Sequence, residues 1–272
     1  MQDKISLAGD LGSGKSTVAK ILTERLGMEY YSTGTICRAV AARHGMTVVE
    51  MNQYMETHPE LDREIDDGLV ALSDDDRALL IDSRMAWHFV RDTFRVYLST
   101  ETAVSAARIF AAGRAEEHFA SVEETEKKIR ERLESEKKRY LQFYGVNNKD
   151  LFHYDFVLDT TYTTPEQVAE ELIAAFRRYQ SDRTYRGAAI SPLRLLYPDA
   201  IADVDAVEPL AEAIDGGERP VVRVFLRGED FCVARDSAVA AFAYALTDLP
   251  YIPCSLTRET EEGDYVRMGD TL

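Results

Sequence analysis

The stretch GDLGSGKST near the start constrains this chain more than any other part of it. Gly9, Gly14, Lys15 and Ser16 fit the spacing G-x-x-x-x-G-K-[ST], and Gly12 adds a glycine between them. The apolar segment KISLAG precedes the stretch, and the helical pattern STVAKILTERLG follows it. Glycines let such a loop wrap closely around an anion, and the loop N–H groups lie at the positive end of the helix. The pattern therefore predicts a strand, an anion-holding loop and a helix.

The residues of this loop also narrow its ligand. Lys15 supplies a mobile positive charge for the outer phosphates of a nucleoside triphosphate, and Ser16 offers a hydroxyl to Mg²⁺. We therefore predict that the chain uses ATP and Mg²⁺. The predicted nucleotide-binding residues are Gly9, Gly12, Gly14, Lys15, Ser16 and Thr17. A glycine-rich turn with no ligand is the alternative, and the agreement of motif and context disfavours it.

Composition limits the classes of partner. The chain has 272 residues, of which 45% are hydrophobic and 29% charged, values typical of a soluble globular protein. Its net charge of −16 argues against broad binding to nucleic acid or to membrane surfaces, so an anionic ligand needs a local cluster of cations. We find no stretch of about 20 apolar residues, and we expect no signal peptide. The widely spaced Cys37, Cys232 and Cys254 predict reduced thiols in a cytoplasm, with neither a disulfide nor a zinc site.

Residues 1–180 alternate short apolar strands with longer helical patterns. This alternation predicts an α/β fold, in which helices flank a parallel five-stranded sheet. The predicted strands are 4–9, 29–31, 78–82, 94–98 and 155–159. The predicted helices are 15–26, 35–44, 47–57, 60–72, 101–112, 122–143 and 165–179, with Thr164 as a cap of the last and Gly145 as the stop of the one before it.

The chain changes character after this region. Residues 181–189 are polar and lack periodicity, which predicts a linker. Residues 190–272 then predict a second, smaller α+β domain. Its expected elements are a helix in VEPLAEAIDGG, strands in PVVRVFL and DFCVA, a helix in DSAVAAFAYAL and a closing strand in YIPCSL.

Several segments besides the loop carry a family resemblance, in the family's own order. They are YSTGTICR, GMTVVEMNQYMETHPELDREID, LLIDSRMAW, RERLESEKKRYLQFYGV and YDFVLDTTYTTPEQV. With the P-loop, they make residues 4–179 resemble the nucleoside monophosphate kinases, specifically the cytidylate kinase-like group. The resemblance implies transfer of the ATP γ-phosphoryl group to CMP or dCMP.

Two strand ends carry candidate acceptor-binding residues. In STGTICR, Thr33 and Gly34 shape a turn, and Arg38 follows within reach of an acceptor phosphate. The alternative for Arg38 is a surface ion pair. In LLIDSR, Asp82 is placed to hold a Mg²⁺-bound water near Ser16, or else it is only a turn residue.

The resemblance assigns two further groups. Arg84 matches the arginine of the family's Asp-Gly-Arg motif, although Ser83 replaces its glycine. Arg132, Glu136 and Arg139 share one helical face and match Arg, Asp and Arg of the family, where the arginines grip phosphates and the carboxylate touches the acceptor nucleoside. The alternative is a solvated helix face, whose ion pairs contribute only about 0.2–0.5 kcal/mol each.

The segment RIFAAGRAEEHFAS has the position and the small residues of a lid. Arg108 and Arg114 are its candidates to reach the transferring group, unless they only pair with Glu116 or Glu117. We expect Lys15, Asp82, Arg108 and Arg132 to act in catalysis, with Ser16 and Asp82 on the metal. The histidines show no metal-ligand spacing, and Trp87 is either core or stacked on a base.

Residues 188–272 weakly resemble the ParB/sulfiredoxin-like fold. Active members carry a Gly-His-x-Arg type turn before the helix, whereas this chain has VARDSA, in which Arg235 is the one residue suited to attract an anion. The departure favours a binding, regulatory or dimerising module over a catalytic one.

Three functions are therefore compatible with the sequence. The first is a cytidylate kinase-like enzyme, acting as a monomer or homodimer on a nucleoside monophosphate, with no nucleic acid or membrane as partner. The second is a P-loop kinase with another nucleotide or a small metabolite as acceptor, which the unusual Ser83, Ser99 and Glu136 motivate. The third is a nucleotide-sensing regulatory module with little catalysis.

Overall fold

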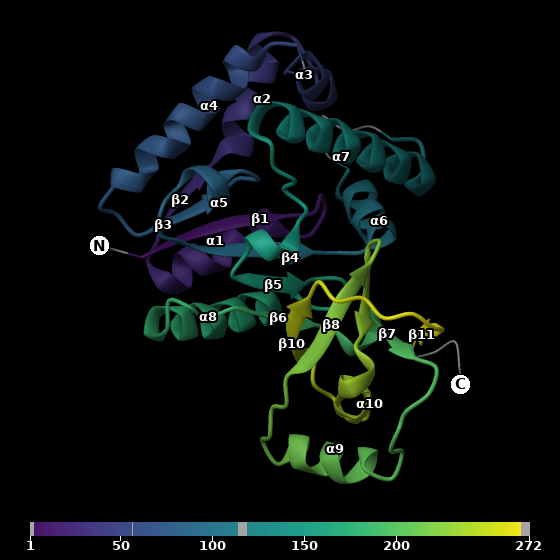
Figure 1. The fold of residues 1–272 in the computed structure, drawn as a ribbon. Helices are drawn as coiled ribbons and strands as arrows, with labels where there is room; N and C mark the ends of the chain where they lie inside the picture. Colours follow the sequence, from purple (N-terminus) through teal and green to yellow (C-terminus); the bar gives the residue numbers. More distant parts are fainter. Residues whose placement is uncertain (1–2, 56, 114–118, 268–272) are drawn as a thin grey trace. The chain divides into compact units, whose positions relative to one another are not determined.

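The computed structural model describes residues 3–55, 57–113 and 119–267, and Figure 1 shows its elements. The chain divides into two compact units, Met1–Asp155 and Phe156–Leu272. The predicted boundary near residue 180 stays a prediction. Within the described ranges, no helix combines the length and the apolar character that crossing a bilayer demands.

The first unit contains a parallel sheet in the order β4-β1-β3-β2. Its strands are β1 (Lys4–Gly9), β2 (Glu29–Ser32), β3 (Leu79–Asp82) and β4 (Thr93–Ser99). All four strands were predicted, and each lies within one or two residues of its predicted bounds. β1 is central and buried along its whole length. Because the strands run parallel, their carboxyl ends meet at one edge, where Ser32 lies beside Asp82 and Gly9 beside Leu98.

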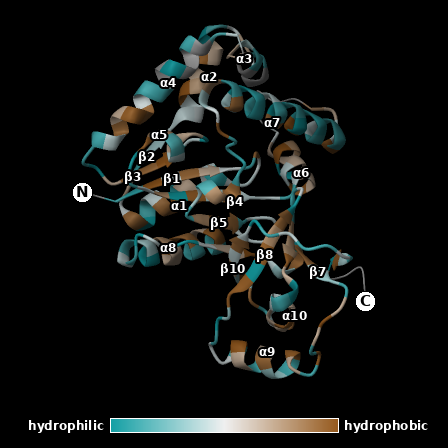
Figure 2. Ribbon diagram, in the orientation of Figure 1, coloured by the Kyte–Doolittle hydropathy of each residue, from teal (hydrophilic) through white to brown (hydrophobic). Residues whose placement is uncertain are grey.

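The helices of the first unit follow the predicted ranges closely. They are α1 (Lys15–Leu26), α2 (Thr33–Arg43), α3 (Val48–Met55), α4 (Pro59–Ala71), α6 (Thr102–Ala112) and α7 (Val122–Tyr144), together with the short α5 (Ala86–Phe89), which the sequence did not predict. Gly145 ends α7 in the left-handed conformation (φ 68°), as predicted. Figure 2 shows that α7 is hydrophilic over much of its length, although one of its faces is buried.

An apolar cluster packs beside the sheet of the first unit. Leu69 from α4 lies with Leu79 and Ile81 of β3 and Val90 after α5. On α1, the apolar periodicity buries Val18, Ala19 and Leu22, and α1 contacts β1, β2 and β3. Burying these side chains fixes the start of α1 against the carboxyl edge of the sheet, and the anion-holding loop lies at that point.

The second unit contains a mixed sheet in the order β11-β7-β9-β8-β10-β6-β5. Its elements are β5 (Phe156–Asp159), α8 (Pro165–Ser181), β6 (Gly187–Ile190), β7 (Leu195–Pro198), α9 (Val207–Asp215), β8 (Val222–Arg227), β9 (Asp230–Val233), α10 (Ala238–Ala245), β10 (Ile252–Thr257) and β11 (Tyr265–Arg267). The predicted helices and strands of this region are confirmed. The sequence missed β6, β7 and β11, and β6 starts inside the range predicted as a linker.

α8 begins as its sequence predicts. The Thr164 hydroxyl accepts from the Gln167 amide (3.3 Å), and the Gln167 side chain accepts from the Thr164 amide (2.9 Å). Pro165 then occupies the first turn, where its missing N–H costs nothing. This reciprocal cap satisfies two backbone donors at a helix end that would otherwise lack partners.

Candidate active site

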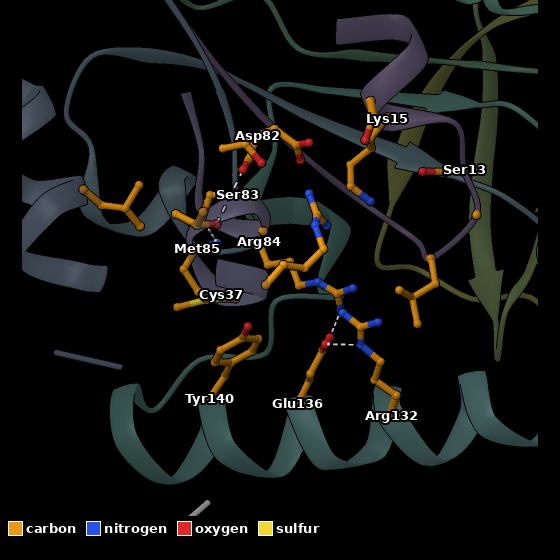
Figure 3. Close-up of a pocket in the computed structure, with 18 of the residues that line it drawn as sticks. Ser13, Lys15, Cys37, Asp82, Ser83, Arg84, Met85, Arg132, Glu136 and Tyr140 are labelled. Atoms are coloured by element: carbon orange, nitrogen blue, oxygen red, sulfur yellow. Dashed lines mark hydrogen bonds and ion pairs between the residues drawn. The ribbon is translucent and has the colours of Figure 1, made fainter. Parts of the chain in front are cut away.

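A cavity of about 250 Å³ opens in the first unit at the carboxyl edge of its sheet. Its walls come from the loop between β1 and α1, the start of α2, the turn after β3 and one face of α7 (Figure 3). In sequence, the described residues that line it range from Leu11 to Tyr140. Segments that are far apart in the sequence therefore meet around one space.

The backbone of the loop needs glycine at three positions. Gly12 and Gly14 have φ angles of 72° and 81°, in the left-handed region that favours glycine. A Cβ atom on Gly9 would lie 2.5 Å from the carbonyl oxygen of Leu98, and one on Gly12 would lie 2.8 Å from that of Ser105. The glycines thus allow the loop to pass close to its neighbours, and Gly14 places the first N–H groups of α1 on the cavity.

Lys15 lines the cavity and folds back over the loop. Its Nζ donates to the carbonyl oxygens of Gly9 (3.0 Å) and Asp10 (2.9 Å). Loss of solvent and the positive charge of Arg84 lower the pKa of Lys15 to about 8, although Asp82 and Asp10 act in the opposite direction. Lys15 is therefore the ammonium whose charge state is most sensitive near neutral pH in this cavity.

Asp10 anchors the loop from behind, and sequence analysis did not single it out. Its carboxylate accepts from the Tyr97 hydroxyl (2.7 Å) and from the Thr100 amide (3.0 Å), and it pairs with Lys149 (3.1 Å). Burial and the Asp10 charge raise the pKa of Tyr97 well above its ordinary value, so that phenol stays a donor. These contacts tie the loop to the end of β4 and to the segment before residue 150.

The turn after β3 brings Asp82 and Arg84 to the cavity wall. Asp82 accepts a hydrogen bond from the Tyr30 hydroxyl (2.8 Å), and Ser16 lines the same cavity. At the position where the family has glycine, Ser83 is buried, and its hydroxyl accepts from the Met85 amide (3.3 Å). The turn thus accommodates the serine and still presents the side chains on either side of it.

Arg84, Arg132 and Glu136 form one ion-paired group on the wall. Oε1 of Glu136 accepts from Nε of Arg132 (3.0 Å), and Oε2 forms an ion pair with Arg84. Figure 3 shows the Glu136 carboxylate beside both guanidinium groups, with a dashed line to each. Arg139, one turn further along α7, is buried against Tyr140, with Cζ 5.2 Å from the ring centroid. The predicted face of α7 is thus turned toward the cavity.

The cavity brings together most of the predicted residues. Those on its wall are Gly12, Gly14, Lys15, Ser16, Thr17, Thr33, Gly34, Arg38, Asp82, Arg84, Arg132, Glu136 and Arg139. Arg38 also donates to the Thr35 hydroxyl (3.1 Å). Two predicted residues are not on the described wall. Gly9 lies behind the loop, and Arg108 on α6 donates to the Thr100 hydroxyl (3.5 Å).

Trp87, another candidate, does not line the described cavity. Trp87 stacks on His153 with the ring centroids 4.3 Å apart, which fits its core role and not base stacking. Arg114 lies outside the residues that the structure describes. In the second unit, Arg235 pairs with Asp199 (3.4 Å), and its backbone amide donates to Glu261 (3.0 Å), so acidic side chains already neutralise the expected anion site.

The wall also carries residues that the sequence did not indicate. They include Ser13, Cys37, Met55, Asp66, Leu69, Met85, Ile109 and Tyr140. Asp66, on α4, accepts a hydrogen bond from the Tyr144 hydroxyl. In the sequence, Asp66 resembles the acidic residues that are common on the exposed face of an amphipathic helix. Only the placement of α4 against the cavity therefore identifies it as a wall residue.

Comparison with known proteins identifies relatives of the first part of the chain. A family model described as the cytidylate kinase-like family matches residues 4–162. A cytidylate kinase from Archaeoglobus fulgidus is 34% identical over 173 residues, which are 63% of this chain and 93% of that protein. A cytidylate kinase from Halorubrum lacusprofundi is 36% identical over 179 residues, or 64% of this chain and 90% of that protein.

A further relative has a different name. An S-adenosylmethionine-dependent nucleotide dehydratase from Lacinutrix mariniflava is 34% identical over 179 residues, and the match spans 65% of this chain but only 37% of that protein. Among solved structures, a shikimate kinase from Acinetobacter baumannii in complex with shikimate is 19% identical, with a TM-score of 0.45 over 66% of this chain and 96% of that one. That similarity is too low to bear on the fold.

Proposed function

The chain belongs to the cytidylate kinase-like family, and from this premise we propose that it transfers the γ-phosphoryl group of ATP to CMP or dCMP. The observation that carries the proposal is that Lys15 and the Arg84 and Arg132 pair line one cavity with the glycine-rich loop. Transfer between two anions requires positive charge around the moving group, and this cavity supplies it.

In the proposed reaction, an oxygen of the acceptor phosphate attacks the γ-phosphorus, the bond to the ADP oxygen breaks, and a diphosphate and ADP result. The acceptor phosphate is already ionised near neutral pH, so no strong general base is needed. Lys15 and the loop N–H groups bind the ATP phosphates. Arg38, Arg84, Arg132 and Arg139 neutralise the acceptor phosphate and the equatorial oxygens.

The metal that such a reaction uses fits the residues present. Hydroxyl and carboxylate oxygens are the ligands that Mg²⁺ prefers, and Ser16 and Asp82 both line the cavity. Within the described ranges, no group of three or more His, Cys, Asp or Glu side chains is placed to hold a metal alone, so phosphate oxygens would complete the ligand set. When bound, Mg²⁺ neutralises charge that develops on the phosphate oxygens.

The acceptor base is the finer part of the proposal. Cytosine differs from uracil in carrying an exocyclic amine, which is a hydrogen-bond donor, and a carboxylate is its natural acceptor. Asp66 is the residue that we propose for this contact, because its carboxylate lines the same cavity as the P-loop. Replacing Asp66 by Asn should reduce kcat/KM for CMP by about tenfold or more and reduce it less for UMP.

A coupled assay with a panel of nucleoside monophosphates tests the proposal on the full-length protein. We expect turnover of CMP or dCMP, and loss of at least about 100-fold in Lys15→Ala. Turnover of another nucleotide or of a small metabolite, and not of CMP or dCMP, would establish the second candidate function, which Ser83 and Glu136 favour as departures from the family pattern. Tight ATP binding without transfer to any acceptor would establish the nucleotide-sensing module.

For residues 190–272 we propose a binding, regulatory or dimerising role, with a ParB/sulfiredoxin-like fold. The pairing of Arg235 with acidic residues supports a module without phosphotransfer activity. A solved structure of the full-length protein, with residues 190–272 compared with that fold, tests the assignment.

A further inference from the structure

Glu136 is an unusual residue for the wall of an anion-binding cavity. It is only 2% exposed, and both of its carboxylate oxygens face arginines rather than solvent. An ionised carboxylate can only accept hydrogen bonds, so it has no donor with which to bind a phosphate. A negative charge in this place therefore needs a reason other than contact with the phosphates.

The partners of Glu136 supply that reason. Arg84 and Arg132 come from separate elements, the turn after β3 and α7, and their side chains are 17% and 18% exposed. Two guanidinium groups beside the same cavity repel one another, and each carries five N–H donors in a rigid plane. A carboxylate that pairs with both offsets the repulsion and fixes the plane of each group, and the pairing uses one nitrogen of each guanidinium.

We propose that Glu136 is a positioning residue, which holds Arg84 and Arg132 in the geometry that phosphoryl transfer needs and does not itself bind the acceptor nucleoside. Donors that are fixed before the reaction stabilise developing charge better than donors that must reorganise. The inference rests on the proposed function for its kinetic consequence, whereas the ion-paired arrangement itself does not depend on any substrate.

The length of the side chain agrees with this role. Glutamate is longer than the aspartate of the family pattern by one carbon–carbon bond, about 1.5 Å. That reach lets a residue on α7 meet the Arg84 side chain from another element while it also meets Arg132 one turn earlier on its own helix. The alternative that the family resemblance implies is a carboxylate that touches the acceptor nucleoside, whereas here both carboxylate oxygens are paired with arginines.

A first experiment measures the arrangement without substrate, by urea unfolding of the full-length protein. The variants are Glu136→Gln, Arg84→Met and the double variant, and Glu134→Gln is the matched control because Glu134 is exposed on the same helix. The effect of the double variant on the unfolding equilibrium constant should differ by at least about fivefold from the product of the effects of the two single variants. If the double variant shows just that product, the proposal is wrong. If Glu136→Gln does not fold, the milder Glu136→Asp replaces it in the same cycle.

A second experiment measures the consequence, with ATP and CMP or dCMP. In Glu136→Gln we expect kcat to fall about 10- to 100-fold, while the ATP dissociation constant changes less than about threefold and the ratio of kcat/KM for CMP to that for dCMP stays constant. Glu136→Asp should recover part of the loss. A change of more than about tenfold in that ratio would show direct contact with the sugar, and an unchanged kcat would equally contradict the proposal.

The two experiments separate this inference from the proposed function. If the wild-type protein phosphorylates neither CMP nor dCMP, the proposed acceptor is wrong, and the unfolding cycle still decides whether Glu136 holds the two arginines. If the wild type is active and the cycle shows no coupling, the proposed function stands and the positioning role of Glu136 is wrong.

Discussion

At the scale of the residue, the charge state of Lys15 governs what the loop can bind. Its folded pKa of about 8 is below the value of about 10.4 that an exposed lysine has. The ammonium therefore begins to lose its proton within the range of ordinary assays. An anionic ligand favours the protonated form, so binding of the ligand and binding of the proton are linked.

This linkage predicts how nucleotide affinity depends on pH. Because the ATP-free protein loses the Lys15 proton around pH 8, we expect the ATP dissociation constant to rise about tenfold between pH 7 and pH 9. Calorimetric titration at constant ionic strength measures it. Lys15→Met, which binds more weakly at every pH, should show no such rise, and an equal rise in that variant would mean that another group titrates.

The same shift predicts a change in stability with the opposite sign. Between pH 8 and about pH 10.4 the unfolded chain still holds the Lys15 proton and the folded chain does not, so the free energy of unfolding should increase with pH. Comparison with Lys15→Met by urea unfolding at pH 8 and pH 10 isolates this contribution. The free energy of unfolding of the wild type minus that of Lys15→Met should therefore increase from pH 8 to pH 10, and a decrease or no change would contradict the assigned pKa.

Alanine substitutions at Gly9 and Gly27 form a matched pair that separates backbone strain from steric contact. Gly27 ends α1 with φ 65° and has nothing near its Cβ position, whereas a Cβ on Gly9 would meet the Leu98 backbone. We expect Gly27→Ala to cost about 1 kcal/mol of stability and to keep ATP binding. Gly9→Ala should cost more than that and weaken ATP binding by at least about tenfold, measured by unfolding and titration of both variants. Equal costs would mean that strand β4 yields to the extra methyl group.

Glycine spacing revealed the loop, yet it gave no sign of what anchors the loop. Asp10 is the second residue of the motif, and its partners lie much later in the sequence, at Tyr97, Thr100 and Lys149. No periodicity links these positions, because the contact depends on β1 and β4 being neighbours in the sheet. Local patterns predict the backbone of a site better than the side chains that hold it.

At the scale of the element, α8 offers a clean test of helix capping. Replacing Thr164 by Ala removes the hydroxyl that accepts from the Gln167 amide, which should lower the free energy of unfolding by about 1 kcal/mol. Arg177→Ala, on an exposed part of the same helix, is the control and should change stability by less than about 0.5 kcal/mol. Equal effects of the two changes would show that the cap contributes nothing of its own.

Most elements could be predicted because their signals are local. The apolar period of α1, the cap of α8 and the glycine after α7 act within a few residues. β6 is different, since its sequence GAAI contains the small residues that strands disfavour. Its register with β5 and β10 makes it a strand, and that pairing is tertiary information. Likewise α5 is a single turn, too short for a period to be read.

At the scale of the whole molecule, the location of the cavity predicts the result of a truncation. A chain that ends at Ser181 keeps every described residue of the cavity wall but removes β6, which pairs with β5 from Phe156 to Leu158. We expect its ATP dissociation constant to stay within about threefold of the full-length value, while Tm falls because β5 loses its partner strand β6. Loss of ATP binding would show that the later residues complete the site.

The two hydrogen bonds from Lys15 to the carbonyl oxygens of Gly9 and Asp10 have a consequence for the resting enzyme. Two of the three N–H donors of the ammonium are thus held by the protein itself, and an incoming nucleotide competes with two backbone oxygens for them. A measured affinity for the nucleotide therefore reports the difference between phosphate and backbone carbonyl oxygens as acceptors for the same N–H donors. Anything that loosens these two hydrogen bonds, by shifting either oxygen, should speed capture of the nucleotide more than it slows release.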